Sequence, residues 1–84
     1  MALIKDELFS IKDVYIPSKR RKTLQASKVS TLAESILEDG MKVPIQVRQG
    51  NGRFVLVEGL HRLEACRALG ETKIACIIVH ARKS

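Results

Sequence analysis

The sequence predicts a mixed fold of the α+β class, in which a small mixed sheet carries packed helices. Three observations predict it. Short stretches rich in β-branched and aromatic residues stand near both ends and in the middle of the chain. Two helical patterns each stop at a glycine, and an Asn-Gly pair separates two of the strand-like stretches. With 84 residues, the chain is expected to form one domain over residues 1–84.

The first strand-like stretches are Leu8–Ile11 and Val14–Ile16, which predict one or two short strands ending at Pro17. Residues 18–26 show no regular apolar spacing and are predicted to form a loop. This loop is strongly basic because it contains Lys19, Arg20, Arg21 and Lys22.

A helix is predicted over Ser27–Asp39, with Ser27 as N-cap and Gly40 as the stop. Its apolar residues recur at helical spacing, so they share one face of about a third of the circumference. They are Val29, Leu32, Ala33 and Ile36.

A β-hairpin is predicted next, with strands at Pro44–Arg48 and Arg53–Val57. The turn is assigned to Asn51-Gly52, because both residue types accept a positive φ. The unbroken apolar run of the second strand predicts cover on both faces. A second helix over Leu60–Leu69 and a last strand over Ile74–Val79 complete the fold, with Gly70 as the stop of that helix.

Composition narrows the function classes. Fifteen basic and nine acidic residues give a net charge of +6, so phosphate is the first ligand class to consider. The longest apolar run, Ile74–Val79, is far short of the ~20 residues that span a bilayer. The start of the chain mixes charged with apolar residues and is unlike a secretory signal, so a cytoplasmic protein is expected. Cys66 and Cys76 lack metal-ligand spacing, which predicts two reduced, buried thiols and no metal site.

The segment Glu58–Arg62 is the most informative one for function. It joins a buried strand to a helix N-terminus, where free N–H groups and the helix dipole favour an anion. His61 and Arg62 stand in the first turn, where a cation is normally disfavoured, so an anion between them would explain their place. The alternative is that Arg62 pairs with Glu58 or Glu64 and that His61 caps the turn.

A second group of polar residues lies along one edge of the first predicted helix, at Lys28, Thr31 and Ser35. A cation and two hydroxyls at this spacing suit phosphate oxygens or a ribose, although such an edge is also typical of a solvated helix. If the fold places this edge beside His61 and Arg62, the two groups form one pocket.

These residues give the chain a resemblance to the superfamily shared by ParB N-terminal domains and sulfiredoxins. Leu32–Gly40 followed by Pro44-Ile45 is similar to a ParB stretch, and Gly59–Arg62 corresponds to the glycine–glutamate–arginine–arginine phosphate motif of ParB. Leu63–Gly70 resembles the helix after that motif. The resemblance covers about Leu8 to Val79.

Sulfiredoxins carry glycine–cysteine–histidine–arginine at the same turn. Gly59, His61 and Arg62 match it, and Leu60 stands in the place of the catalytic cysteine. Lys28, Thr31 and Ser35 match the spacing of the sulfiredoxin ATP-binding helix with the two hydroxyl residues exchanged. A leucine is no nucleophile, so the resemblance implies binding of a nucleotide without sulfiredoxin chemistry.

The resemblance implies a domain that binds ATP or another nucleotide, with or without Mg²⁺, and that acts on or beside DNA. Phosphate-binding residues would be Lys28, Thr31, Ser35, Gly59, His61 and Arg62. One alternative is a ParB-like nuclease or phosphotransferase with Glu58 as general base. Another is a degenerate sulfiredoxin. A third is a non-specific nucleic-acid-binding module that uses Lys19, Arg20, Arg21, Lys22, Arg48, Arg53 and the basic tail Arg82–Ser84, although three aromatic residues are few for base stacking.

Overall fold

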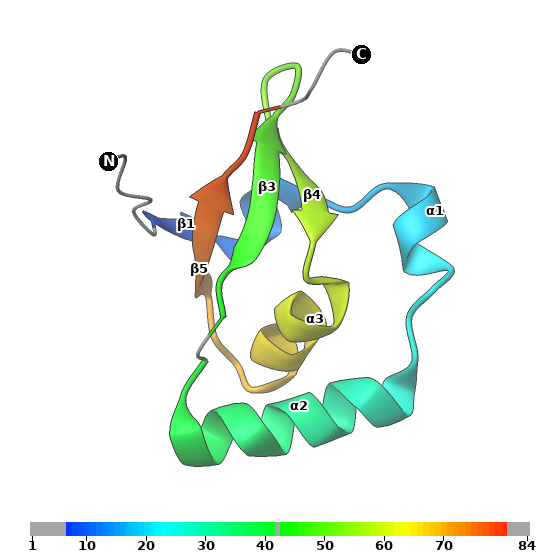
Figure 1. The fold of residues 1–84 in the computed structure, drawn as a ribbon, viewed down its shortest axis with the longest axis vertical. Helices are drawn as coiled ribbons and strands as arrows, with labels where there is room; N and C mark the ends of the chain where they lie inside the picture. Colours follow the sequence, from blue (N-terminus) through cyan, green and yellow to red (C-terminus); the bar gives the residue numbers. More distant parts are fainter. Residues whose placement is uncertain (1–6, 42, 81–84) are drawn as a thin grey trace.

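The computed structural model describes residues 7–41 and 43–80. Within these residues, five strands form one mixed sheet; of the three α-helices, the two longer ones lie at one end of the sheet and the short first one lies to the side, beyond the fourth strand of the chain (Figure 1). The α+β prediction is therefore confirmed. The elements are β1 (Glu7–Ser10), the 3-10 helix η1 (Ile11–Asp13), β2 (Val14–Tyr15), α1 (Ser18–Arg21), α2 (Ala26–Asp39), β3 (Ile45–Gln49), β4 (Phe54–Glu58), α3 (Leu60–Ala68) and β5 (Lys73–Ile78).

The strand order in the sheet is β1-β5-β3-β4-β2. β1 pairs antiparallel with β5 and β3 pairs antiparallel with β4, whereas the pairs β3–β5 and β2–β4 are parallel. The interior place of β4 explains its continuous apolar run, because the neighbouring residues Val55 and Leu56 point to opposite faces and both are buried.

The predicted hairpin forms between β3 and β4, and its turn lies where it was expected. Gly50 N–H donates to the carbonyl of Arg53 at 2.6 Å, so this bond encloses Asn51 and Gly52 as the two central residues of the turn. Gly52 has a φ of +77°, whereas Asn51 does not have a positive φ. The position of the turn is thus confirmed, and the turn requires a positive φ at Gly52 alone.

The prediction of a continuous loop over the basic stretch 18–26 is wrong, because this stretch contains the short helix α1. Its first turn is closed by the carbonyl of Pro17, which accepts from the N–H groups of Arg20 at 2.9 Å and Arg21 at 3.2 Å. Proline fixes φ and so favours this start. No residue of α1 is buried, so its sequence has no apolar spacing from which a helix could be predicted.

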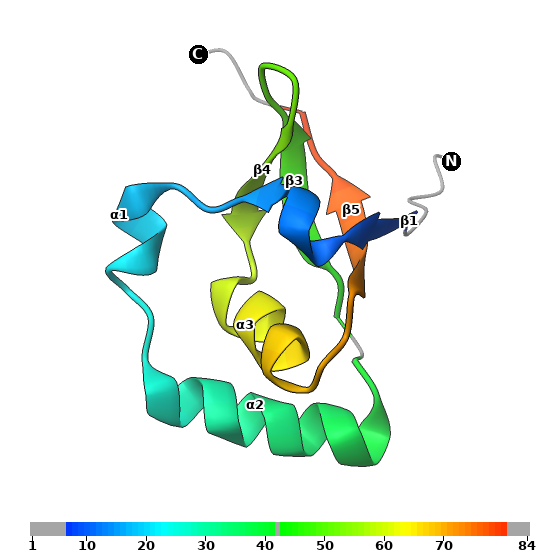
Figure 2. The ribbon, with the colours of Figure 1, turned by 180° about the vertical axis from the view of Figure 1, so that it is seen from behind.

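The two longer helices, α2 and α3, form successive layers at one end of the sheet. α3 lies between the sheet and α2, which crosses beneath it (Figures 1 and 2). The predicted apolar face of α2 is confirmed, because Val29, Leu32, Ala33 and Ile36 are all half-buried. The most deeply buried side chains are Ile45, Val47, Leu63 and Cys76. Both cysteines are free and buried, as predicted.

None of the described helices combines the length and the apolar character that crossing a bilayer requires.

Candidate nucleotide-phosphate site

The turn between β4 and α3 is built around Gly59. This residue has a φ of +109° and serves as the N-cap of α3. The first N–H inside the helix that finds an acceptor is that of Leu63, which donates to the Gly59 carbonyl at 2.9 Å. Among the residues that the structure describes, no side chain caps the helix, and its first turn contains no acidic residue. The N–H groups of the first turn are therefore available to an anion.

A cavity of about 350 Å³ opens at this turn. It combines residues from α1, the segment before α2, α2 itself, the end of β4 and the start of α3. Of these elements, α2 and α3 pack against each other (Figure 1). Its lining residues are Arg20, Thr23, Lys28, Leu32, Glu58, Gly59, Leu60, His61 and Arg62. The structure thus brings Lys28 next to Gly59, His61, Arg62 and Glu58, which are separated from it by about thirty positions in the sequence.

The two hydroxyl residues of α2 lie outside this lining. Thr31 lines an adjoining hollow of about 270 Å³ together with Ser27, Lys28 and Leu32. Its hydroxyl donates to the carbonyl of Ser27 at 3.0 Å. Ser35 is exposed further along α2 and lines neither space. Lys28 belongs to both, so it connects the cavity with the hollow.

Arg62 is the group whose bonding is incomplete. Its Nε is buried and has no hydrogen-bond acceptor among the residues that the structure describes. The two acids that could have neutralised Arg62 are engaged elsewhere. Glu58 lies 3.8 Å from Arg20, and Glu64 lies 3.3 Å from Arg67 on the same helix. The alternative in which one of these acids pairs with Arg62 is therefore wrong for the described residues.

His61 is held by the main chain. The N–H of Gln25 donates to Nε2 of His61 at 3.1 Å, and Gln25 is the N-cap residue of α2. An acceptor role for Nε2 leaves Nδ1 as the protonated nitrogen of the neutral ring. His61 does not cap its own helix. It fastens the beginning of α2 to the beginning of α3, and its Nδ1–H remains as a donor.

Sequence reasoning did not find two features of the cavity. Arg20 faces Glu58 at the cavity instead of standing with its basic neighbours, because consecutive residues of the helix α1 diverge by about 100°. Thr23 also lines the cavity, and its hydroxyl donates to the Arg20 carbonyl at 2.7 Å. The start signal at Pro17 could have shown that the basic stretch is helical.

The turn offers no nucleophile at position 60. Leu60 is 6% exposed and packs into the core. The thiol nearest in sequence, Cys66, is buried one and a half turns further along α3 and donates to Sδ of Met41 at 3.5 Å. Burial raises the pKa of the Cys66 thiol above its ordinary value, and the carboxylate of Glu71 raises it further. Cys66 is thus kept in its unreactive form. In the described part of the chain, no three His, Cys, Asp or Glu side chains gather as a metal-binding group.

Comparison with known proteins places the chain among related sequences. The family model of the ParB N-terminal domain matches residues 7–84. A probable chromosome-partitioning protein ParB from Campylobacter jejuni is 39% identical over 62 residues, which are 74% of this chain and 22% of that protein. The chloroplastic/mitochondrial sulfiredoxin of Arabidopsis thaliana is 37% identical over 62 residues, which are 74% of this chain and 50% of that sequence. The chain therefore spans half or less of the length of these relatives.

Solved structures show the same fold. The crystal structure of Arabidopsis thaliana sulfiredoxin superposes with a TM-score of 0.78 at 30% identity, over 95% of this chain and 88% of that chain. A C-terminally truncated ParB from Caulobacter crescentus, complexed with CTP-γ-S, gives a TM-score of 0.77 at 23% identity, over 94% of this chain and 46% of that chain. By its family match, the chain belongs to the ParB N-terminal domain family, and it is similar to proteins of both the ParB and the sulfiredoxin type.

Proposed function

We propose that the cavity at the start of α3 binds the phosphate groups of a nucleotide. The observation that carries this proposal is Arg62, whose buried Nε has no acceptor among the described residues and which lines a cavity at an uncapped helix N-terminus. An unpaired buried donor costs about 1–3 kcal/mol, and a phosphate oxygen would recover that cost. The CTP-γ-S bound to the Caulobacter ParB supports the choice of a nucleotide.

Each group of the cavity has a role in this proposal. The free N–H groups of the first turn and the Arg62 guanidinium hold phosphate oxygens, and Lys28 contributes a point charge. His61 donates through Nδ1, because its Nε2 accepts from Gln25. Gly59 permits the sharp turn that aims these donors at one point.

The size of the two spaces suggests where the rest of the nucleotide lies. The cavity of about 350 Å³ is at the lower end of ligand-site volumes, so it suits phosphates better than a whole nucleotide. The adjoining hollow shares Lys28 and presents Thr31. In this arrangement the sugar and base extend along α2 over Thr31. Ser35 is too far along α2 to line either space and is therefore a weaker candidate for contact with the nucleotide.

Titration of isotope-labelled protein with ATP, ADP, CTP and GTP, with and without Mg²⁺, tests the proposal. The amide signals of residues 59–62 and 28 should shift, and Arg62→Ala should weaken binding about tenfold or more, as expected for loss of a charged hydrogen-bond donor. Arg67→Ala is the matched control, because it removes the same charge from the same helix outside the cavity. If no nucleotide shifts the turn, the proposal is wrong.

A catalytic role for Glu58 is a second candidate, favoured by the position of its carboxylate in the same cavity. Glu58 could act as general base in phosphoryl transfer or in cleavage of a phosphodiester. Glu58→Gln should then abolish turnover of a labelled nucleotide or plasmid. Because this substitution also removes a negative charge beside the phosphates, it should strengthen nucleotide binding severalfold. Turnover that survives in Glu58→Gln would exclude the catalytic role of Glu58. It would not count against the proposal that the cavity binds a nucleotide.

A further inference from the structure

A second and larger cavity, of about 620 Å³, lies along β2. It is walled by η1, β2, α1 and the loop that joins β3 to β4. Its polar lining residues are Lys12, Asp13, Tyr15, Arg21, Gln49 and Arg53. None of these residues lines the cavity at the start of α3.

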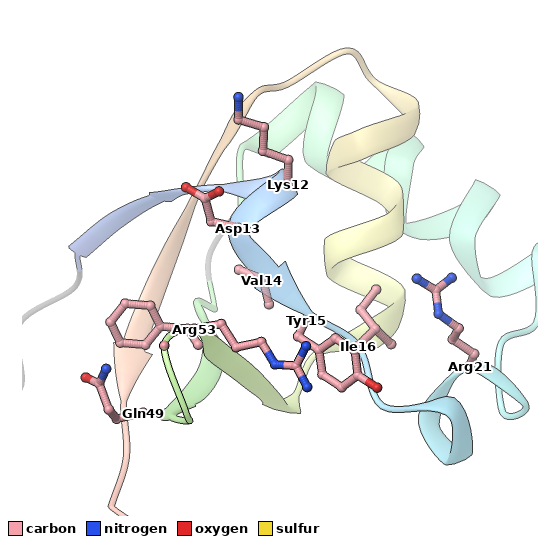
Figure 3. A pocket seen from close by; sticks show the side chains of 10 residues that line it. Lys12, Asp13, Val14, Tyr15, Ile16, Arg21, Gln49 and Arg53 are labelled. Atoms are coloured by element: carbon pink, nitrogen blue, oxygen red, sulfur yellow. The ribbon is translucent and has the colours of Figure 1, made fainter.

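A stacked pair stands in the middle of this lining. The guanidinium carbon of Arg53 lies 3.7 Å from the centroid of the Tyr15 ring. Figure 3 shows the two side chains side by side, with Arg21 on one side, Gln49 on the other, and Lys12 and Asp13 extending from η1 at the far end. Tyr15 is 39% exposed and Arg53 is exposed as well, so the pair presents a flat cationic surface to a ligand.

The charges of this cavity are unbalanced and unpaired. Lys12, Arg21 and Arg53 contribute three cations against the single carboxylate of Asp13. Among the described residues, the ion pairs found are Arg20–Glu58 and Arg67–Glu64, so none of these four side chains takes part in one. Free cations around a hollow indicate an anionic ligand.

The helix α1 divides its basic residues between the two cavities. Arg20 faces Glu58 at the start of α3, whereas Arg21 lines the cavity along β2. The exposed Lys19 and Lys22 flank this position. The cationic surface therefore continues beyond the cavity, as a ligand with repeated negative charges requires.

Two of the three aromatic residues of the chain meet at this cavity. Tyr15 and Phe54 line it, and Phe9 stacks on Phe54 with ring centroids 4.5 Å apart. The sequence suggests too few aromatics for base stacking, because the linear order does not show that Tyr15 and Phe54 stand on the paired strands β2 and β4.

We infer that the cavity along β2 binds single-stranded nucleic acid, with one base stacked on the Arg53 guanidinium and the adjoining phosphates held by Lys12 and Arg21. A planar cation supported by an aromatic ring matches the face of an exposed base. An acidic peptide would need cations but no flat platform. A duplex keeps its base faces inside its own stack, so it could use the cations alone.

Fluorescence anisotropy with a labelled oligothymidine of about eight nucleotides tests this inference, since stacking sites accept any base. The logarithm of the association constant should fall with the logarithm of salt concentration with a slope of about −2, because each of the three cations Lys12, Arg21 and Arg53 neutralises about one phosphate of the strand and contributes about −0.7. Arg53→Ala should weaken binding about tenfold and reduce the slope by about 0.7.

The variant Arg53→Lys separates stacking from charge. Lysine keeps the positive charge but lacks the planar guanidinium group on which a base can stack. Binding should therefore weaken about threefold or more while the salt slope stays the same. Lys73→Ala is the matched control, because this exposed lysine begins β5, which is separated from β2 by β3 and β4 in the sheet, and lines neither cavity. It should bind within a factor of two of the unchanged protein. Both residues are exposed, so all three variants should fold, which circular dichroism checks.

Four outcomes would overturn the inference. Equal losses in Arg53→Ala and Lys73→Ala would show diffuse charge attraction without a site. Arg53→Lys binding like the unchanged protein would remove the stacking role. A duplex of the same length, or a polyglutamate peptide, that competes as well as the single strand would assign another ligand class. Loss of oligothymidine binding in Arg62→Ala, with Arg53→Ala unaffected, would place the strand at the start of α3. Nucleotide binding at the start of α3 should be unchanged in Arg53→Ala, so the first three results would leave the nucleotide proposal standing.

Discussion

The backbone of Gly59 lies directly against the side chain of Ile45. A β-carbon at position 59 would stand 2.6 Å from Cγ2 and 2.9 Å from Cβ of Ile45. Ile45 is completely buried at the start of β3, so it has no space into which it can move. The turn that presents the first residues of α3 to the cavity thus depends on the absence of a side chain at position 59, as well as on its φ of +109°.

Gly59→Ala should lower the free energy of unfolding by about 2–4 kcal/mol, the sum of a left-handed backbone penalty and an overpacked core. Gly70→Ala is the control, because Gly70 has a φ of +84° and open space where a β-carbon would stand. It should cost about 1–2 kcal/mol. Urea denaturation of both variants measures the difference. Equal losses would mean that the contact with Ile45 costs nothing.

Phe9 and Phe54 form a stacked pair across the sheet. Their centroids are 4.5 Å apart and their planes differ by 21°, although β5 and β3 lie between their strands in the sheet order. A double-mutant cycle with Phe9→Leu and Phe54→Leu should give a coupling energy of about 0.5–1.5 kcal/mol, beyond the loss of buried area. Additive losses would show that the rings contribute through area alone.

The Cys76 thiol should make stability depend on alkaline pH. Burial raises its pKa to about 11 from the ordinary value of 9.0; a backbone hydrogen bond at Phe9 opposes this shift and the charge of Glu7 adds to it. Between pH 9 and about 11 the unfolded chain loses this proton while the folded chain keeps it, so the free energy of unfolding should fall as pH rises. Cys76→Ala should show a smaller decrease over this range in urea denaturation at each pH. Parallel curves for the two proteins would contradict the prediction.

His61 should protect the start of α2 from local opening. Its Nε2 accepts from Gln25 N–H, a contact that spans 36 positions of the chain. His61→Ala should speed hydrogen exchange of the Gln25 amide about fivefold to tenfold, because one hydrogen bond is worth about 1 kcal/mol. His80→Ala is the control, since this exposed histidine lies after β5. If both variants leave exchange at Gln25 unchanged, the contact does not hold the two helices together.

Local patterns of the sequence predicted most of the secondary structure. The apolar face of α2, from Val29 to Ile36, appears as expected because helical spacing depends on residues three and four apart. The hairpin and the end of α3 at Gly70 also follow from nearby residues. At Gly70 the N–H donates to the Arg67 carbonyl and the next N–H, of Glu71, donates to the Cys66 carbonyl, both at 3.0 Å. The helix α1 escaped prediction because a four-residue helix without a buried face has no such pattern.

The cavities show where sequence reasoning reaches its limit. The motif at Gly59–Arg62 marked the turn, because a cation-bearing helix start after a buried strand is a local feature. The same spacing rule grouped Lys28, Thr31 and Ser35 on one helix edge, yet the path of α2 past α3 brings Lys28 to the turn and leaves Ser35 away from it.

Short-range patterns were enough to predict the strands and the two longer helices, to relate the chain to its family and to mark the turn at which an anion is expected. The tertiary structure alone decided that Glu58 faces Arg20 instead of Arg62, and that Arg21, Tyr15 and Arg53 line one cavity. The physical reason is distance along the chain. Periodicity and capping act between residues a few positions apart, whereas a cavity forms where segments from distant parts of the chain pack together, and their relative placement depends on the whole core.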